Sequence, residues 1–227
     1  MKRTHLKQKG FTLTELMIVV ALAAIFATLA VPNMGGMIAR QRVQGQANEI
    51  ANAFTFAHTE AVRRGKPVFV VPGQINNNGK LNGAATDWGS ATALLVFADN
   101  GANNQTYDTD EDLRVVPLNS QITFPEISKE ELGKDITKKN KTDMAFVYYS
   151  NGQMRIGKVD SSNKKVSVTE PSGAIGRIMM KHNNRTTKHQ ATRFCEVVRV
   201  NATGRATVYA GKRTDLNTKK TDFFYCE

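Results

Sequence analysis

The chain has 227 residues, which suits one domain and is short for two. Lysine and arginine outnumber aspartate and glutamate by 31 to 20, so the formal net charge is +11, and nucleic acids, anionic lipids and acidic proteins are the partners that such a surface suggests. The sequence has no phosphate loop, no Gly-x-Ser-x-Gly motif and no His-Glu-x-x-His motif, so we expect no catalytic residue, no metal site and no cofactor.

A basic stretch and then a long apolar run open the chain. Residues 1–10 contain four cations and no acid: Lys2, Arg3, Lys7 and Lys9. From Phe11 to Val31 the only charged residue is Glu15. As a helix this run would be about 30 Å long, the thickness of a bilayer's hydrocarbon core, so we predict a membrane span over 11–31. A carboxylate inside such a span needs a partner.

Three interpretations of this stretch are possible. A secretory signal peptide has a shorter apolar core and a cleavage site after it, whereas here Gly10 precedes the run. A plain membrane anchor fits the length but leaves Gly10 and Glu15 unexplained. The third interpretation rests on a resemblance. The order basic leader, Gly-Phe-Thr-Leu-x-Glu and apolar helix resembles the class III signal of type IV pilins and type II secretion pseudopilins.

The resemblance implies specific processing. A prepilin peptidase, which is also an N-methyltransferase, would cut between Gly10 and Phe11 on the cytoplasmic face and methylate the new amine of Phe11. The family implies that Glu15 neutralises the terminal amine of a neighbouring subunit, because two charges in a medium of low dielectric constant gain far more by pairing than they do in water. The alternative is a carboxylate that reaches the membrane interface without any role.

A second helical segment follows the apolar run. Pro32, Gly35 and Gly36 weaken a helix, so we expect a kink or local melting there. An amphipathic pattern then resumes, with Arg63 and Arg64 in its last turn and Gly65 as its cap. Its apolar positions recur every three or four residues: Val43, Ala47, Ile50, Ala51, Phe54, Ala57, Ala61 and Val62. The prediction is one long helix over 11–64.

Residues 65–227 have the pattern of short strands separated by turns. Two short segments, Asn151-Gly152 and Asn201–Gly204, are typical of hairpin turns. Two longer segments are interpreted as loops, Pro72–Asp87 and Lys129–Thr142. A short helix is the alternative for Lys129–Thr142. The predicted strands are Pro67–Val71, Ala93–Ala98, Leu113–Leu118, Met144–Tyr149, Met154–Val159, Phe194–Val200 and Arg205–Ala210. We therefore predict an α+β fold in which the helix packs against a C-terminal antiparallel β-sheet domain.

Within this region the resemblance narrows to the FimT/FimU/GspH pilin subfamily. The segments that carry it are Leu94–Gly101, Tyr107-Asp108, Leu113–Val116 and Val198–Arg205. Members of that subfamily have β-sheets over the second half of the helix, which is the pilin fold, and act as minor subunits that initiate and cap a filament. The implied partners are other major and minor pilins, the prepilin peptidase, the membrane and the inner-membrane assembly platform.

The two cysteines, Cys195 and Cys226, lie near the end of the chain. In an exported domain such a pair forms one disulfide, whereas in the cytosol two free thiols are expected. A bond between them would close a loop of about 32 residues and stabilise the domain by about 3.5–4 kcal/mol in the chain-entropy model.

Weaker signals concern ligands. The four histidines are scattered and are interpreted as solvated loop residues. The segment Asp108-x-Asp110-x-Asp112 is interpreted as an acidic turn and not as a calcium loop, because Leu113 stands where a calcium loop needs glycine.

The region 177–220 is strongly basic. Some FimT-type proteins bind DNA through Gly-Arg-x-Arg; here Gly204-Arg205 is followed by Thr207, so DNA contact through Arg205, Lys212 and Arg213 is the less favoured reading.

The function that best unites these features is that of a minor pilin. We expect an inner-membrane precursor with a periplasmic C-terminal domain that is later incorporated into a pilus on the cell surface, where it supports assembly, twitching motility or adhesion. A receptor for DNA uptake and a minor pseudopilin of a type II secretion system are the alternatives.

Overall fold

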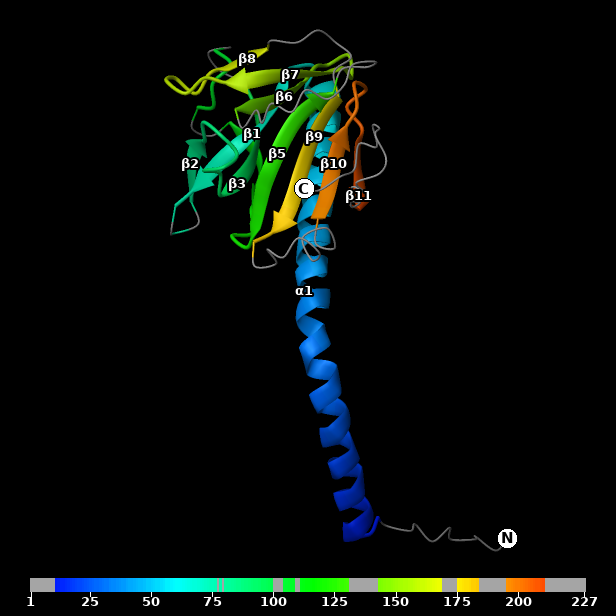
Figure 1. The fold of residues 1–227 in the computed structure, drawn as a ribbon. Helices are drawn as coiled ribbons and strands as arrows, with labels where there is room; N and C mark the ends of the chain where they lie inside the picture. Colours follow the sequence, from blue (N-terminus) through cyan, green and yellow to red (C-terminus); the bar gives the residue numbers. More distant parts are fainter. Residues whose placement is uncertain are drawn as a thin grey trace, which may run out of the picture. The chain divides into compact units, whose positions relative to one another are not determined.

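The computed structural model describes residues 11–76, 78, 80–99, 104–108, 111–130, 143–168, 175–183 and 195–210, with backbone only at 29–34, 125–126 and 128–130. The chain divides into two compact units, Met1–Ala39 and Arg40–Glu227. The second unit contains the later half of the helix together with the β-strands (Figure 1).

The helix α1 runs from Leu13 to Arg64 without interruption. The backbone is helical through Pro32, Gly35 and Gly36, so local melting is not seen there, and the kink stays a prediction. The predicted end is confirmed. Gly65 has a φ of 66° and its N–H donates to the carbonyl of Ala61 at 3.1 Å, as a C-terminal glycine cap does.

The larger sheet is antiparallel and has the order β4-β3-β1-β6-β7-β8, with β2 also paired to β1 (Figure 1). Its strands are β1 (Val68–Ile75), β2 (Leu81–Ala84), β3 (Ala93–Ala98), β4 (Asp112–Pro117), β6 (Met144–Tyr148), β7 (Met154–Val159) and β8 (Val166–Val168). The turn between β6 and β7 contains the predicted Asn151-Gly152, and Gly152 has a φ of 79°.

The smaller sheet is also antiparallel and has the order β11-β10-β9-β5. Its strands are β5 (Ile122–Glu130), β9 (Ile175–His182), β10 (Cys195–Val200) and β11 (Ala206–Ala210). Figure 1 shows this sheet beside the part of α1 that belongs to the same unit, so the helix lies against both sheets. The expected α+β architecture is confirmed.

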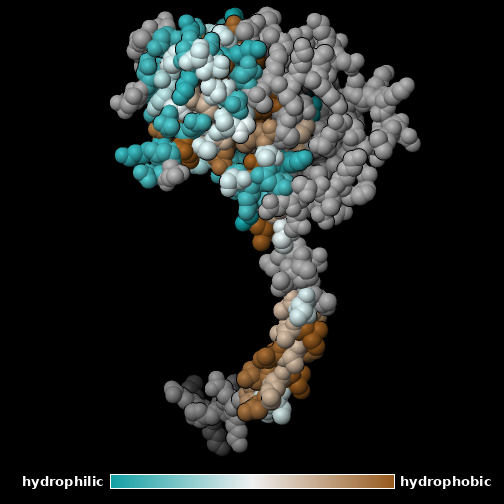
Figure 2. All heavy atoms as spheres, turned by 60° about the vertical axis from the view of Figure 1, so that its left-hand side comes forward, coloured by the Kyte–Doolittle hydropathy of each residue, from teal (hydrophilic) through white to brown (hydrophobic). Residues whose placement is uncertain are grey.

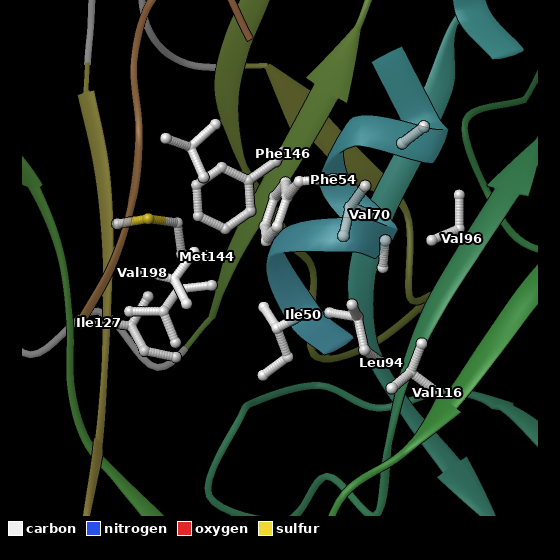
Figure 3. Close-up of a cluster of buried hydrophobic side chains, with 14 of the residues drawn as sticks. Ile50, Phe54, Val70, Leu94, Val96, Val116, Ile127, Met144, Phe146 and Val198 are labelled. Carbon is white, nitrogen blue, oxygen red and sulfur yellow. The ribbon is translucent and has the colours of Figure 1, made fainter. Parts of the chain in front are cut away.

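The main core lies where the helix meets the two sheets (Figure 3). Phe54 of α1 packs edge-on against Phe146 of β6, with 4.9 Å between ring centroids, and lies 6.4 Å from the ring of Tyr148. Six of the eight predicted apolar helix positions are fully buried: Val43, Ala47, Ile50, Phe54, Ala57 and Ala61. Ala51 is half-buried. Val62 is 52% exposed, because it lies about 100° round the helix from the buried Ala61, so its placement on the buried face was wrong.

A polar helix residue, Gln46, is buried with this face although it is not one of the apolar positions of the pattern. Its amide nitrogen donates to the carbonyl of Pro117 at 3.3 Å, and its amide oxygen accepts from the N–H of Asn119 at 2.9 Å. One turn earlier, Arg42 donates to the side chain of Gln121. Burial is tolerated because both polar atoms of Gln46 are hydrogen-bonded, and these bonds hold the β4–β5 connection on the helix.

The larger sheet is buried on its other face too. Phe69 and Phe97 stack there with centroids 4.9 Å apart, and the ring of Tyr107 meets Phe97 edge-on at 5.6 Å. With Val71, Leu95 and others they form a second apolar cluster, against which Leu81 of β2 also packs. Strands covered on both faces are continuously apolar, which explains why the runs in β1 and β3 do not alternate.

Two glycines let the sheets approach each other closely. A side chain at Gly176 of β9 would lie 2.1 Å from a ring carbon of Phe146. Gly204, in the β10–β11 turn, has a φ of 80°, and a Cβ there would lie 2.5 Å from the ring of Tyr148. The hydroxyl of the buried Tyr148 donates to the carbonyl of Gly204 at 2.9 Å. Aromatic rings of the larger sheet therefore fill the space that glycines leave in the smaller one.

The strand predictions were right for seven of these elements and missed β2, β5, β8 and β9. The interpretation of Pro72–Asp87 as a loop was wrong in part, because β1 continues to Ile75 and β2 lies inside that range. β5 contains Pro125, which is tolerated because β5 is the last strand in the order of the smaller sheet and its pairing with β9 shifts register between Thr123 and Glu126. Lys129 and Glu130 belong to β5, and 131–142 lie outside the described residues.

The close approach at Gly176 generates a stability prediction. Gly176→Ala forces the new methyl group into Phe146, and overpacking of this kind costs about 1–3 kcal/mol. We expect a lower thermal midpoint for the full-length protein in detergent, measured by circular dichroism. The matched control is Gly45→Ala on the exposed face of α1, where an added Cβ would have no neighbour within 4 Å beyond the adjacent helix backbone; it should raise the helix's stability by about 0.5–1 kcal/mol. Equal midpoints for both variants would contradict the packing argument.

Candidate functional site

The N-terminal unit exposes an apolar helix surface. Every described side chain from Phe11 to Thr28 is exposed, including Phe11 at 86% and Phe26 at 68%. Figure 2 shows this part of α1 as hydrophobic. A helix that is apolar all round must be covered by other helices or by lipid. In the part of the chain that is described, no helix is both long and apolar enough to cross a membrane. The predicted span over 11–31 stays a prediction.

The first turn of α1 is closed by a capping box. The hydroxyl oxygen of Thr12 accepts from the N–H of Glu15 at 3.2 Å. In return, Oε2 of Glu15 accepts from the N–H of Thr12 at 3.1 Å and from its hydroxyl at 3.0 Å. Two backbone donors that a helix start leaves without partners are thereby satisfied.

Sequence reasoning missed this role of Glu15. The signal was present, because Thr12-Leu13-Thr14-Glu15 is the Thr-x-x-Glu pattern of a capping box just before an apolar run. Glu15 thus has a partner within its own chain, and its pairing with a neighbouring subunit stays a prediction. Gly10, on the other side of the expected cleavage site, lies outside the described residues.

The candidate DNA contacts are placed only in part. Arg205 is exposed directly after the β10–β11 turn, whereas Lys212 and Arg213 lie outside the described residues. Thr207, where a second arginine would stand, is half-buried, and its hydroxyl donates to the carbonyl of Arg199 on the neighbouring strand at 3.4 Å. A side chain at Gly204 would clash with Tyr148, so the glycine of the Gly-Arg pair has a structural reason that is independent of DNA.

Two histidines are not the solvated loop residues that we expected. His58 is half-buried on α1, with its ring 5.7 Å from that of Tyr148, and a Cβ at Gly204 would lie 3.1 Å from it. His182 is buried at the end of β9. Their burial comes from residues far away in the sequence. His5 and His189 lie outside the described residues.

The acidic turn has internal partners. Glu111 is buried and accepts from the N–H of Asp108 at 3.2 Å, and Asp112 accepts from the hydroxyl of Tyr107 at 3.1 Å. Asp110 lies outside the described residues. Among the residues that are described, no group of three or more histidine, cysteine or acidic side chains is arranged to hold a metal ion.

Cys195 is buried at the first position of β10, next to Met179 and Val197. Cys226 lies outside the described residues, so the bond between the two cysteines stays a prediction.

A buried acid, Glu196, lies one residue further along β10. Loss of hydration on burial raises the pKa of its carboxyl group, and the positive charge of Arg40 on α1 opposes this shift in part. The carboxyl group of Glu196 therefore loses hydration on folding, and the charge of Arg40 compensates for only part of this loss.

Comparison with known proteins decides the family. A family model described as type II transport protein GspH matches residues 46–204, more than half of the chain. The chain belongs to this family. A second model, described as a prokaryotic N-terminal methylation motif, matches residues 5–31. The protein is therefore a type IV pilin-like protein, and members of the GspH family are structural proteins and not enzymes. The methylation motif implies processing by a prepilin peptidase, and the GspH family implies other pilins as partners.

Curated relatives are fimbrial proteins. A Pseudomonas aeruginosa fimbrial protein is 43% identical over 61 residues, 27% of this chain and 39% of its own length. The type IV major fimbrial protein FimA of Dichelobacter nodosus is 42% identical over 102 residues, 44% of this chain and 63% of its own length. The chain thus spans less than two thirds of these relatives. A crystal structure of the P. aeruginosa type IV minor pilin FimU is similar, with a TM-score of 0.39 and 13% identity over 75% of this chain and 90% of that one.

Glu196 generates a prediction on pH. Its carboxyl binds a proton more tightly in the folded state, so its contribution to the free energy of unfolding is largest at low pH and is lost as the pH rises from the unfolded pKa through the folded one. Glu196→Gln should therefore raise the thermal midpoint at about pH 7, and the gain should shrink in acid.

The control is Glu60→Gln, near the C-terminal end of α1. The guanidinium groups of Arg63 and Arg64, both hydrogen-bonded to Glu60, lower the pKa of this acid to about 2. Its removal should not raise the midpoint at neutral pH. A midpoint for Glu196→Gln at or below that of the wild type at about pH 7 would show that ionised Glu196 is not destabilising.

Proposed function

We propose that the protein is a minor pilin of a type IV pilus that contributes to assembly initiation and the tip complex. The observation that carries this proposal is the exposed apolar helix over 11–28, which lies within the matched N-terminal methylation motif at residues 5–31. Such a surface needs a membrane before assembly and a bundle of like helices afterwards. The β-sheet domain then supplies the contacts that distinguish one pilin from another.

In this proposal the precursor sits in the inner membrane over 11–31, with residues 65–227 in the periplasm. The prepilin peptidase removes residues 1–10 and methylates Phe11, and the inner-membrane assembly platform moves the product into a filament on the cell surface. Support comes from the basic leader, because cytoplasmic flanks of membrane helices are rich in lysine and arginine. Twitching motility and adhesion would be properties of the assembled filament.

A minor pseudopilin of a type II secretion system is the second candidate. The family model carries the name of a type II transport protein, whereas the curated relatives are named fimbrial proteins. We favour the pilus because of these relatives. A deletion strain distinguishes the two functions. Loss of surface filaments with normal protein secretion supports a role in the pilus, whereas normal filaments with loss of protein secretion support a role in the secretion system.

Processing is the first test. Gly10→Val should leave the precursor uncut, because the side chain next to the scissile bond no longer fits a site shaped for glycine, and the wild-type N-terminal peptide should begin with N-methyl-Phe11. Mass spectrometry of that peptide and immunoblots of sheared filaments measure both. Gly45→Ala, on the exposed helix face, is the control and should be processed and incorporated normally. An intact leader on the filament-borne wild type would refute the proposal.

DNA uptake is the remaining alternative. The observation that favours it is the exposed side chain of Arg205. We expect weak retardation of duplex DNA that disappears steeply with salt, because few phosphates can be contacted. Arg205→Ala with Lys212→Ala should weaken it further, whereas Lys158→Ala, an exposed cation on β7 that pairs with Asp143, is the control. Tight binding that survives about 0.2 M salt would favour the receptor function.

A further inference from the structure

We propose that the outer edge of β11 is a docking site for an extended segment of another pilin, which adds one strand to the smaller sheet and carries acidic residues at its ends. The proposal rests on the function proposed above for the kind of partner. β11 is the last strand of the smaller sheet (Figure 1), and within the described residues it pairs with β10 and with no other strand.

The backbone groups of every second residue of β11 point away from β10. The N–H of Asn201 donates to the carbonyl of Arg205 at 3.0 Å, and this bond sets the alternation of hydrogen-bonded pairs along the hairpin. Ala206, Val208 and Ala210 stand in the pairs that make no hydrogen bond to β10. Their N–H and C=O groups are therefore directed to the outer edge, where they form a template for a further strand.

The other edge strands have features that oppose such pairing. Charged residues, proline, bulges and short length are the usual ones. β4 contains Asp112, Arg114 and Pro117, and β5 contains Pro125 together with a shift in register. β2 and β8 have only four and three residues. The sequence of β11, Ala-Thr-Val-Tyr-Ala, has no charge and no proline, and its register against β10 is continuous. Among the edge strands that the structure describes, β11 alone lacks all of these features.

Charge indicates which strand fits this edge. The exposed Arg205 directly precedes β11, and Lys212 and Arg213 follow it in the sequence. A second copy of the chain would bring like charges together, which is destabilising. Parallel pairing would place Arg205 beside the same residue of the other copy, and antiparallel pairing centred on Val208 would place it near Lys212 of the other copy. Acidic residues at the ends of the added strand would instead face these cations favourably.

The row of backbone groups favours a peptide over a nucleic acid. It presents donors and acceptors in alternation, and an extended peptide satisfies both. The phosphates of DNA only accept hydrogen bonds, so they would leave the outward carbonyl groups of β11 without partners. The basic residues near β11 are therefore assigned to an acidic strand.

The test uses the full-length protein in detergent micelles and measures amide hydrogen exchange along β11 by NMR. The probe is the peptide acetyl-Glu-Thr-Val-Thr-Val-Glu-amide. The same peptide with lysine in place of both glutamates tests the charge, and a short DNA duplex tests the other class of ligand. The variants are Ala210→Pro, which removes one outward donor, and Ala210→Ser, which keeps it. Ala210 is exposed, and proline is tolerated on an edge strand where the N–H would face outward.

We expect the acidic peptide to slow exchange at Ala206, Val208 and Ala210. Exchange at Thr207 and Tyr209 should not change, because their backbone groups already pair with β10. Ala210→Pro should weaken binding of the peptide about three- to tenfold, the loss that corresponds to one hydrogen bond, whereas Ala210→Ser should bind like the wild type. The lysine peptide should bind more weakly than the acidic one.

Four results would overturn the proposal. The first is no slowing by the acidic peptide, and the second is equal binding of the acidic and lysine peptides. The third is protection of the same amides by the DNA duplex, which would assign the edge to nucleic acid. The fourth is slow exchange at Ala206, Val208 and Ala210 without any ligand, which would show that residues 211–227 or a second copy already cover the edge.

A measurement in the host strain links the edge to assembly. The fraction of Ala210→Pro in sheared filaments should be lower than that of Ala210→Ser, with equal processing of both by mass spectrometry of the N-terminus. Equal incorporation of the two variants would refute the pilin as the partner. The proposed function fails differently. If a deletion strain keeps its filaments, the role in the pilus is wrong, while the exchange measurement in micelles still decides whether the edge of β11 binds a strand.

Discussion

The contact of Phe54 with Phe146 and Tyr148 is the interaction on which the second unit depends. It brings the helix and the larger sheet together, and the same two rings of that sheet reach Gly176 and Gly204 in the smaller one. A larger residue at either glycine would push the smaller sheet away from the helix. One aromatic cluster thus determines where three elements that are far apart in the sequence meet.

The apolar surface of the helix α1 changes along its length. Over 11–28 it is apolar on all sides and exposed, whereas from Arg40 onward only one face is apolar and that face is buried in the domain. The first part suits lipid or a bundle of like helices, and the second part anchors a β-sheet domain. At the start of this helix the capping box satisfies donors that hydrocarbon cannot.

Features that depend on neighbours in the sequence were predictable. The helix end at Gly65, the turn at Asn151-Gly152 and the bounds of β3 followed from local patterns, because capping and turn geometry involve only a few consecutive residues. The methylation motif around Gly10 and Phe11 belongs to the same class, since a peptidase recognises it as a short linear segment. The capping box of Thr12 and Glu15 is also local, although it was not predicted.

The amino-acid sequence by itself therefore determined the long helix, the processing motif and most strands. The tertiary structure alone decided which polar residues are buried and at which glycines a side chain would clash. Gln46 is buried because the β4–β5 connection supplies hydrogen-bond partners for both of its polar atoms, and a side chain at Gly176 is destabilising because Phe146 of the other sheet fills its space. Pro125 is tolerated inside β5 because this strand is the last in the order of the smaller sheet and its pairing with β9 shifts register there. Each of these depends on residues distant in the chain, whose proximity no local pattern encodes.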